Sequence, residues 1–83
     1  MNLEQDLIDF INADLSLDPS VRIEQDTEML IEGLVDSLGV IRMVQWIEDR
    51  LTIEIDPADV IFDHFCSVEA VFAFIARHRA DAS

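Results

Sequence analysis

Residues 36–51 read DSLGVIRMVQWIEDRL, and this stretch decides the fold of the 83-residue chain. Placing each residue about 100° after the one before it gathers five apolar side chains on one side of a helix. They are Val40, Met43, Val44, Ile47 and Leu51. A stripe of this kind is typical of a helix that packs against other helices. We therefore expect a central helix here, with the stripe in the core.

The segments on either side also have helical spacing. Apolar residues recur every three or four positions from Leu3 to Leu15 and predict a first helix over residues 3–15. Asp56 followed by Pro57 predicts a short third helix that ends near Phe62. A fourth helix is expected over about residues 68–78, with an apolar stripe formed by Val68, Val71, Phe72 and Ile75.

A long connection over residues 16–35 separates the first two helices. Asp18 and Pro19 predict a turn in it. Its apolar residues are expected to tether it to the core: Leu17, Val21, Ile23, Met29, Leu30 and Leu34. The expected fold is one all-α domain over residues 1–83, a small bundle of three main helices and one short third helix.

The charge of the chain is strongly negative. Eighteen Asp and Glu face five Arg and no Lys, which gives a formal net charge of −13. Such a chain repels nucleic acid and anionic membranes and favours basic protein surfaces. Hydrophobic residues make up 51% of it, so we expect a folded domain rather than a disordered tail. We also expect a monomer. The acidic start and the lack of an apolar run near ~20 residues predict a cytoplasmic protein without a membrane span.

Motifs for metal binding and catalysis are incomplete. A calcium loop counted from Asp14 has Pro19 at its sixth position and Gln25 at its twelfth, so the required Gly and Glu are missing. His64 and Cys66 are too few ligands for a metal site. We expect Cys66 to be a small buried hydrophobe and predict no catalytic residue, no metal and no enzymatic activity.

Ser37 lies where the long connection meets the central helix, and spacing alone makes it an ordinary helix cap. However, Asp36-Ser37-Leu38 resembles the Asp-Ser-Leu motif of the acyl carrier proteins. The resemblance extends over the second helix, over residues 53–57 and over the start of the last helix at residues 66–71. It covers most of the chain between Gly33 and Ile75.

This resemblance implies a function. In the family, a phosphopantetheinyl transferase attaches 4'-phosphopantetheine from coenzyme A to the serine, and the arm then holds an acyl group as a thioester. By resemblance, Ser37 is the attachment residue and Asp36 is recognised by the transferase, although Asp36 could also cap the helix. The implied partners are this transferase, an acyl- or aminoacyl-loading enzyme, and a downstream acyltransferase or synthase.

A second face of the central helix is expected to bind these partners. It carries Leu38, Ile41, Arg42, Gln45, Glu48 and Asp49. Leu38 and Ile41 serve as apolar anchors in this interpretation, while Glu48 and Asp49 form an acidic rim. Leu38 and Ile41 could equally close against the long connection, and the sequence leaves both possibilities open.

Three positions depart from the usual pattern of fatty-acid carriers. Gly39 and Arg42 stand where that pattern has acidic residues, and Gln45 stands where an apolar residue is usual. These departures favour a freestanding carrier in a specialised pathway, such as polyketide, nonribosomal peptide or aminoacyl chemistry. We expect Gly39 to allow the close approach of a partner. The alternative is a helical protein-interaction module of carrier-like fold that carries no phosphopantetheine.

Overall fold

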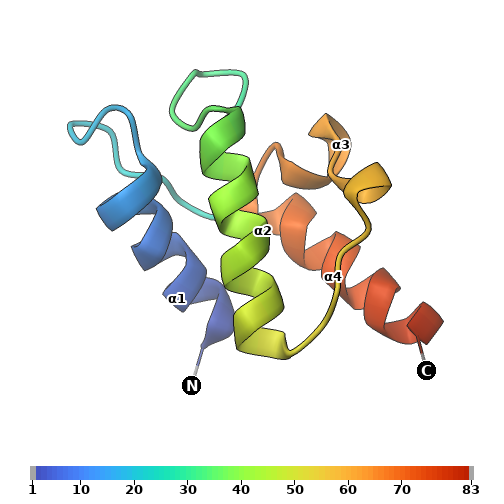
Figure 1. Ribbon diagram of the computed structural model, residues 1–83. Helices are drawn as coiled ribbons and strands as arrows, with labels where there is room; N and C mark the ends of the chain where they lie inside the picture. Colours follow the sequence, from blue (N-terminus) through green and yellow to red (C-terminus); the bar gives the residue numbers. More distant parts are fainter. Residues whose placement is uncertain (1, 83) are drawn as a thin grey trace.

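The computed structural model describes residues 2–82, and the side chains of residues 2–78. The helices are α1 (Leu3–Phe10), α2 (Ser37–Leu51), α3 (Phe62–Phe65) and α4 (Val68–Ala82). α1 and α2 lie side by side and antiparallel, α4 runs from behind α2 toward the lower right, and α3 lies above α4 (Figure 1). No strand occurs within residues 2–82. The predicted all-α bundle with a short third helix is therefore confirmed.

The apolar stripe of α2 forms the centre of the core. Val40, Met43, Val44 and Ile47 are buried as predicted, whereas Leu51 is half-buried. α4 is longer than predicted, and Phe74 is a core residue that the predicted stripe left out, whereas Phe72 is only half-buried. The other buried side chains come from all parts of the fold: Leu7, Ile8, Ile11, Leu15, Ile23, Met29, Leu34, Val35, Ile55, Phe65, Val68, Val71 and Ile75.

The first helix covers the predicted residues but changes its hydrogen bonding along the way. After Phe10 it continues as a π-helical turn, Ile11–Leu15, which the Ser16 N–H closes onto the Ile11 carbonyl at 2.8 Å. π-Helical turns are rare and usually mark a local irregularity in a helix. This turn includes Asn12, whose side chain holds the long connection.

The Asn12 side chain clamps the connection by hydrogen bonds to the backbone of Ile23. The Asn12 amide donates to the Ile23 carbonyl at 2.9 Å and accepts from the Ile23 N–H at 2.9 Å. It also donates to the Ile8 carbonyl at 3.0 Å. Because the Ile23 side chain is fully buried, this pairing satisfies backbone groups that water reaches poorly.

The tethering of the connection agrees with the prediction only in part. Ile23, Met29 and Leu34 are buried and Leu30 is half-buried, but Leu17 and Val21 are exposed at 58% and 39%. Backbone hydrogen bonds, rather than these two side chains, hold the connection in place. The Leu17 N–H donates to the Leu34 carbonyl at 2.8 Å, and the Met29 N–H donates to the Cys66 carbonyl at 3.0 Å.

The short third helix is present, but it begins later in the chain than the sequence predicts. Asp56 and Pro57 do begin a helical turn, but it is a 3-10 turn, Pro57–Asp59, and α3 begins only at Phe62. Val60 and Ile61 are β-branched, a type that favours extended backbone, and Ile61 adopts it with φ −123° and ψ 161°. This break lets Phe65 reach the core, where it is fully buried.

The acidic turn at Asp18 is closed by hydrogen bonds within the chain. The Asp18 carboxylate accepts from the Ser20 hydroxyl at 2.6 Å and from the Ser20 N–H at 3.0 Å. These two bonds, the hydroxyl first, hold the pKa of Asp18 below its usual value. Among the described residues, no group of three or more His, Cys, Asp or Glu is arranged to hold a metal ion. None of the described helices combines the length and the apolar character that a membrane span needs.

Replacing Asn12 by Ala should destabilise the protein by about 1–3 kcal/mol, because it leaves the N–H and the carbonyl of Ile23 without partners. Urea unfolding measures the change. Gln5→Ala is the matched control, since the Gln5 side chain donates only to the exposed Asp9 carboxylate. Its expected effect is within about 0.5 kcal/mol. Equal losses from the two variants would mean that the Asn12 pairing does not hold the connection.

Ile47 and Ile41 test the two faces of α2 in the same way. Ile47 is 1% exposed and Ile41 is 52% exposed. Ile47→Ala should therefore cost about 2–5 kcal/mol as a core truncation. Ile41→Ala should cost less than about 1 kcal/mol. Thermal melts in which Ile41→Ala is as damaging as Ile47→Ala would show that the faces are wrongly assigned.

Candidate functional site

At the start of α2, one residue caps the helix and the next is left free: Asp36 is the cap and Ser37 follows it. Asp36 is the N-cap, with extended backbone (φ −98°, ψ −177°), and its carboxylate accepts from the Gly39 N–H at 2.9 Å. Ser37 is the first residue of the helix and is exposed. Its hydroxyl makes no hydrogen bond to other residues in the described part of the chain. The interpretation of Ser37 as the cap is therefore wrong, and its hydroxyl is free to react.

The helix end beside this hydroxyl suits a phosphate. The first N–H groups of a helix have no partner within it, and they lie at the positive end of the helix dipole. Here Asp36 occupies only the N–H of Gly39, so the N–H groups of Ser37 and Leu38 have no partner within residues 2–82. A phosphate on the Ser37 oxygen lies next to these donors.

Gly39 has an internal role rather than the predicted role in partner approach. It is buried, and a Cβ at this position would lie 2.7 Å from Val35 Cγ1 and 3.9 Å from Leu15 Cβ. Since Val35 is itself buried and stiff at χ1, it has little room to move. Glycine therefore allows the end of the long connection to pack directly on α2, which fixes the approach to Ser37.

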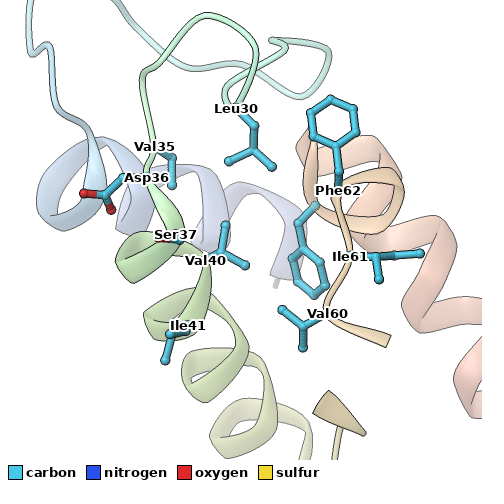
Figure 2. A pocket seen from close by; sticks show the side chains of 10 residues that line it. Leu30, Val35, Asp36, Ser37, Val40, Ile41, Val60, Ile61 and Phe62 are labelled. Atoms are coloured by element: carbon cyan, nitrogen blue, oxygen red, sulfur yellow. The ribbon is translucent and has the colours of Figure 1, made fainter. Parts of the chain in front are cut away.

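An apolar groove of about 540 Å³ opens beside Ser37, between α2 and the segment that contains α3. Figure 2 shows Val40 and Val60 facing each other across it, with Leu30 above them and the Asp36 carboxylate on the opposite side of α2. The groove is lined by Leu30, Val35, Asp36, Ser37, Val40, Ile41, Val60, Ile61, Phe62 and Phe65. The walls formed by Leu30 and by Val60–Phe62 were not predicted from the sequence. The available signal was the run of three apolar residues at positions 60–62, which leaves no room for a polar face.

The predicted partner face is exposed but divides into two parts. Leu38, Ile41, Arg42, Gln45 and Asp49 are all exposed, with Leu38 at 64%. Ile41 lines the groove, whereas Leu38 and Arg42 line a smaller hollow. That hollow also contains Asp14, Leu15, Leu17, Asp36 and Gly39. Leu38 and Ile41 therefore do not close against the connection as core residues.

Glu48 differs from the other members of the predicted face. It is half-buried, and its carboxylate accepts a hydrogen bond from the Ile55 N–H at 2.8 Å. This contact ties the end of α2 to the segment that follows it, after Thr52 has turned the chain with a left-handed backbone (φ 54°). The prediction of Glu48 as a free rim charge is corrected accordingly.

His64 and Cys66 have structural surroundings. His64 Nδ1 lies 2.8 Å from the Asp59 carbonyl oxygen, so it carries the proton in this contact. The ring also stacks on Phe74, with 4.4 Å between centroids. Cys66 is half-buried rather than buried as predicted. His64 therefore fastens the 3-10 turn, and with it the far wall of the groove, to α4.

Glu48→Lys should destabilise the protein by about 1.5–3 kcal/mol, because it removes a charge-assisted hydrogen bond to a backbone N–H. Asp49→Lys makes the same change of charge at the neighbouring exposed position and should stay within about 0.5 kcal/mol. Chemical denaturation of the two variants side by side gives the comparison. Similar stabilities would refute the anchoring role of Glu48.

Comparison with protein-family models gives a match over residues 5–75, to the family described as phosphopantetheine attachment site. Comparison with curated proteins gives no significant match. The matched region contains most of α1, all of α2 and α3, about half of α4, the groove and Ser37. Proteins of this family carry a covalent 4'-phosphopantetheine group. The chain belongs to the phosphopantetheine attachment-site family, and its all-α fold is of the acyl-carrier-protein type.

Proposed function

We propose that Ser37 is the residue that carries 4'-phosphopantetheine and that the protein presents an acyl, polyketide or aminoacyl group to partner enzymes. The observation that carries this proposal is the free, exposed Ser37 hydroxyl at the first position of α2. Asp36 caps the helix in its place. The serine is therefore not needed for capping and is accessible to a transferase.

The attachment reaction uses the Ser37 oxygen as the nucleophile. This oxygen forms a bond to the phosphorus of coenzyme A that bears the pantetheine, the bond from that phosphorus to the nucleotide portion breaks, and a base of the transferase takes the serine proton. The product is a phosphodiester with a negative charge. The free N–H groups of Ser37 and Leu38 and the helix dipole stabilise this charge.

The apolar groove supports a carrier function next to the attachment point. When bound, phosphopantetheine supplies a thiol that holds an acyl group as a thioester. Leu30, Val40 and Val60 give the groove apolar walls beside Ser37, and such walls shield hydrocarbon from water. Arg42 and Gly39 support a role in a specialised biosynthetic pathway rather than in general fatty-acid synthesis.

Partner enzymes must bring their active sites to Ser37, and α2 is the helix exposed beside it. We place the transferase, the loading enzyme and a downstream acyltransferase or synthase on the face formed by Leu38, Ile41, Arg42, Gln45 and Asp49. Apolar anchors at an interface chiefly set residence time, whereas exposed charges chiefly set encounter rate and specificity. Elsewhere on the molecule, the net charge of −13 favours contact with basic partner surfaces.

The alternative is an interaction module of the same fold that carries no phosphopantetheine. In that case Ser37 has only a structural role, and the usual structural role of a serine at the start of a helix is to cap it. Asp36 already performs it, which supports the carrier function over this alternative.

The decisive measurement is the intact mass of the protein after incubation with coenzyme A and a broad-specificity phosphopantetheinyl transferase. We expect a gain of one phosphopantetheine in the native chain and no gain in Ser37→Ala. Ser20→Ala is the control, since Ser20 is an exposed serine outside α2 and its loss should leave the gain intact. Folded native protein that gains no mass, or Ser37→Ala that still gains it, would refute the assignment.

A further inference from the structure

Arg42 is an exposed cation with no carboxylate partner among residues 2–78. Arg22 lies 3.0 Å from Glu24 and 3.7 Å from Asp9, and Arg50 lies 2.6 Å from Asp6. Arg42 has no ion pair within the described residues, and its one internal contact is to the Asp14 carbonyl oxygen at 3.4 Å. That distance is long for a hydrogen bond and does not neutralise the charge.

The surroundings of Arg42 are those of a contact site rather than of a solvated surface charge. Arg42 lines the hollow at the junction of α2, the π-helical turn and the long connection. The apolar side chains of Leu17 and Leu38 line the same hollow and are 58% and 64% exposed. Two acidic residues line the hollow as well: the Asp36 carboxylate accepts from the Gly39 N–H, and Asp14 meets Arg42 through its carbonyl oxygen and forms no ion pair with it. Arginine beside exposed apolar side chains is the composition typical of protein interfaces.

The position of this hollow relative to Ser37 decides what meets it. Leu38 follows Ser37 directly, so an enzyme that reaches Ser37 over the exposed face of α2 also covers Arg42. A guanidinium covered by a partner needs an acceptor, and its planar fork matches a carboxylate. A basic partner surface at the same place meets a like charge, which disfavours the complex.

We propose that Arg42 is a specificity-determining residue: it selects partner enzymes that place a carboxylate against it, beside an apolar side chain that contacts Leu17 and Leu38. It disfavours enzymes whose carrier-binding surface is basic at this point. This inference rests on the proposed carrier function, because it requires that partners act at Ser37.

The probe for this inference is a phosphopantetheinyl transferase with a basic carrier-binding surface, assayed with coenzyme A by the rate at which Ser37 gains mass. Arg42→Glu should raise kcat/KM by about threefold to tenfold at low ionic strength, and Arg42→Gln should fall between it and the native chain. The gain should shrink in high salt, because exposed charges are screened within about 10 Å at 0.1 M. Thermal melts confirm that the variants fold.

Arg77→Glu is the matched control. Arg77 is exposed on α4, whose C-terminal end lies away from the start of α2 (Figure 1). This variant changes the net charge by the same amount and should give less than half of the Arg42→Glu effect. Equal acceleration by both variants would show that only net charge matters, and no acceleration by Arg42→Glu would place Arg42 outside the contact. Either result overturns the proposal.

A charge swap on the transferase tests the preference for a carboxylate directly. Basic residues of its carrier-binding surface are changed to Glu one at a time, and each variant is assayed with the native chain and with Arg42→Glu. We expect one transferase variant to modify the native chain at least threefold faster than it modifies Arg42→Glu, reversing the original order. If no variant reverses it, the proposal is wrong. If no transferase modifies any folded variant, the native chain included, the proposed function itself fails and this inference falls with it.

Discussion

The hydrogen bond from the Gly39 N–H to the Asp36 carboxylate sets the first residue of α2, and the geometry of the site follows from it. With Asp36 as the cap, Ser37 becomes the first helical residue, and its hydroxyl remains exposed beside free N–H groups. Moving the cap by one residue would turn the serine hydroxyl toward the backbone, because N-cap side chains accept from the N2 or N3 N–H. The aspartate thus keeps the serine available for chemistry.

This start of α2 is in turn held in place by the connection that precedes it. Val35 packs so closely on Gly39 that a Cβ there would lie 2.7 Å away, and the Asn12 clamp fixes the same connection at Ile23. Neither contact touches Ser37. Both nevertheless determine where the chain enters the helix. The position of Ser37 therefore depends on packing along residues 12–39 as well as on the local cap. The proposed attachment residue is exposed, but the contacts that fix its position are buried.

How far the sequence predicted this structure differs between its parts. The core stripe of α2 was predictable because a helix on the inside of a bundle must repeat its apolar residues at the helical period, and Val40, Met43 and Ile47 do so. The third helix was not predictable, because the cap signal at Asp56 and the β-branched pair at Val60 and Ile61 favour different backbones, and the burial of Phe65 decides between them.

The candidate site was likewise predictable only where chemistry is local. The Asp-Ser-Leu motif pointed to Ser37, but helical position alone could not show that the Asp49 carboxylate is free whereas the Glu48 carboxylate is engaged. The Glu48 carboxylate accepts from the Ile55 N–H, which lies seven residues further along the chain and reaches Glu48 only because Thr52 turns the backbone. The role of Gly39 was hidden for the same reason, since Val35 and Leu15 approach it through the fold and not through the sequence pattern.

The two hollows at the start of α2 differ in the chemistry of their walls. The groove beside Ser37 and Ile41 is lined mainly by apolar side chains, whereas the hollow beside Leu38 contains Arg42 and two carboxylates. Apolar contacts distinguish hydrocarbon groups poorly, because one methylene changes the binding free energy by only about 1 kcal/mol. Charges discriminate between protein surfaces far better, because a mispaired charge in a contact remains unsatisfied. In the proposed carrier function, the charged side of the helix therefore offers a sharper means of choosing partners than the groove does.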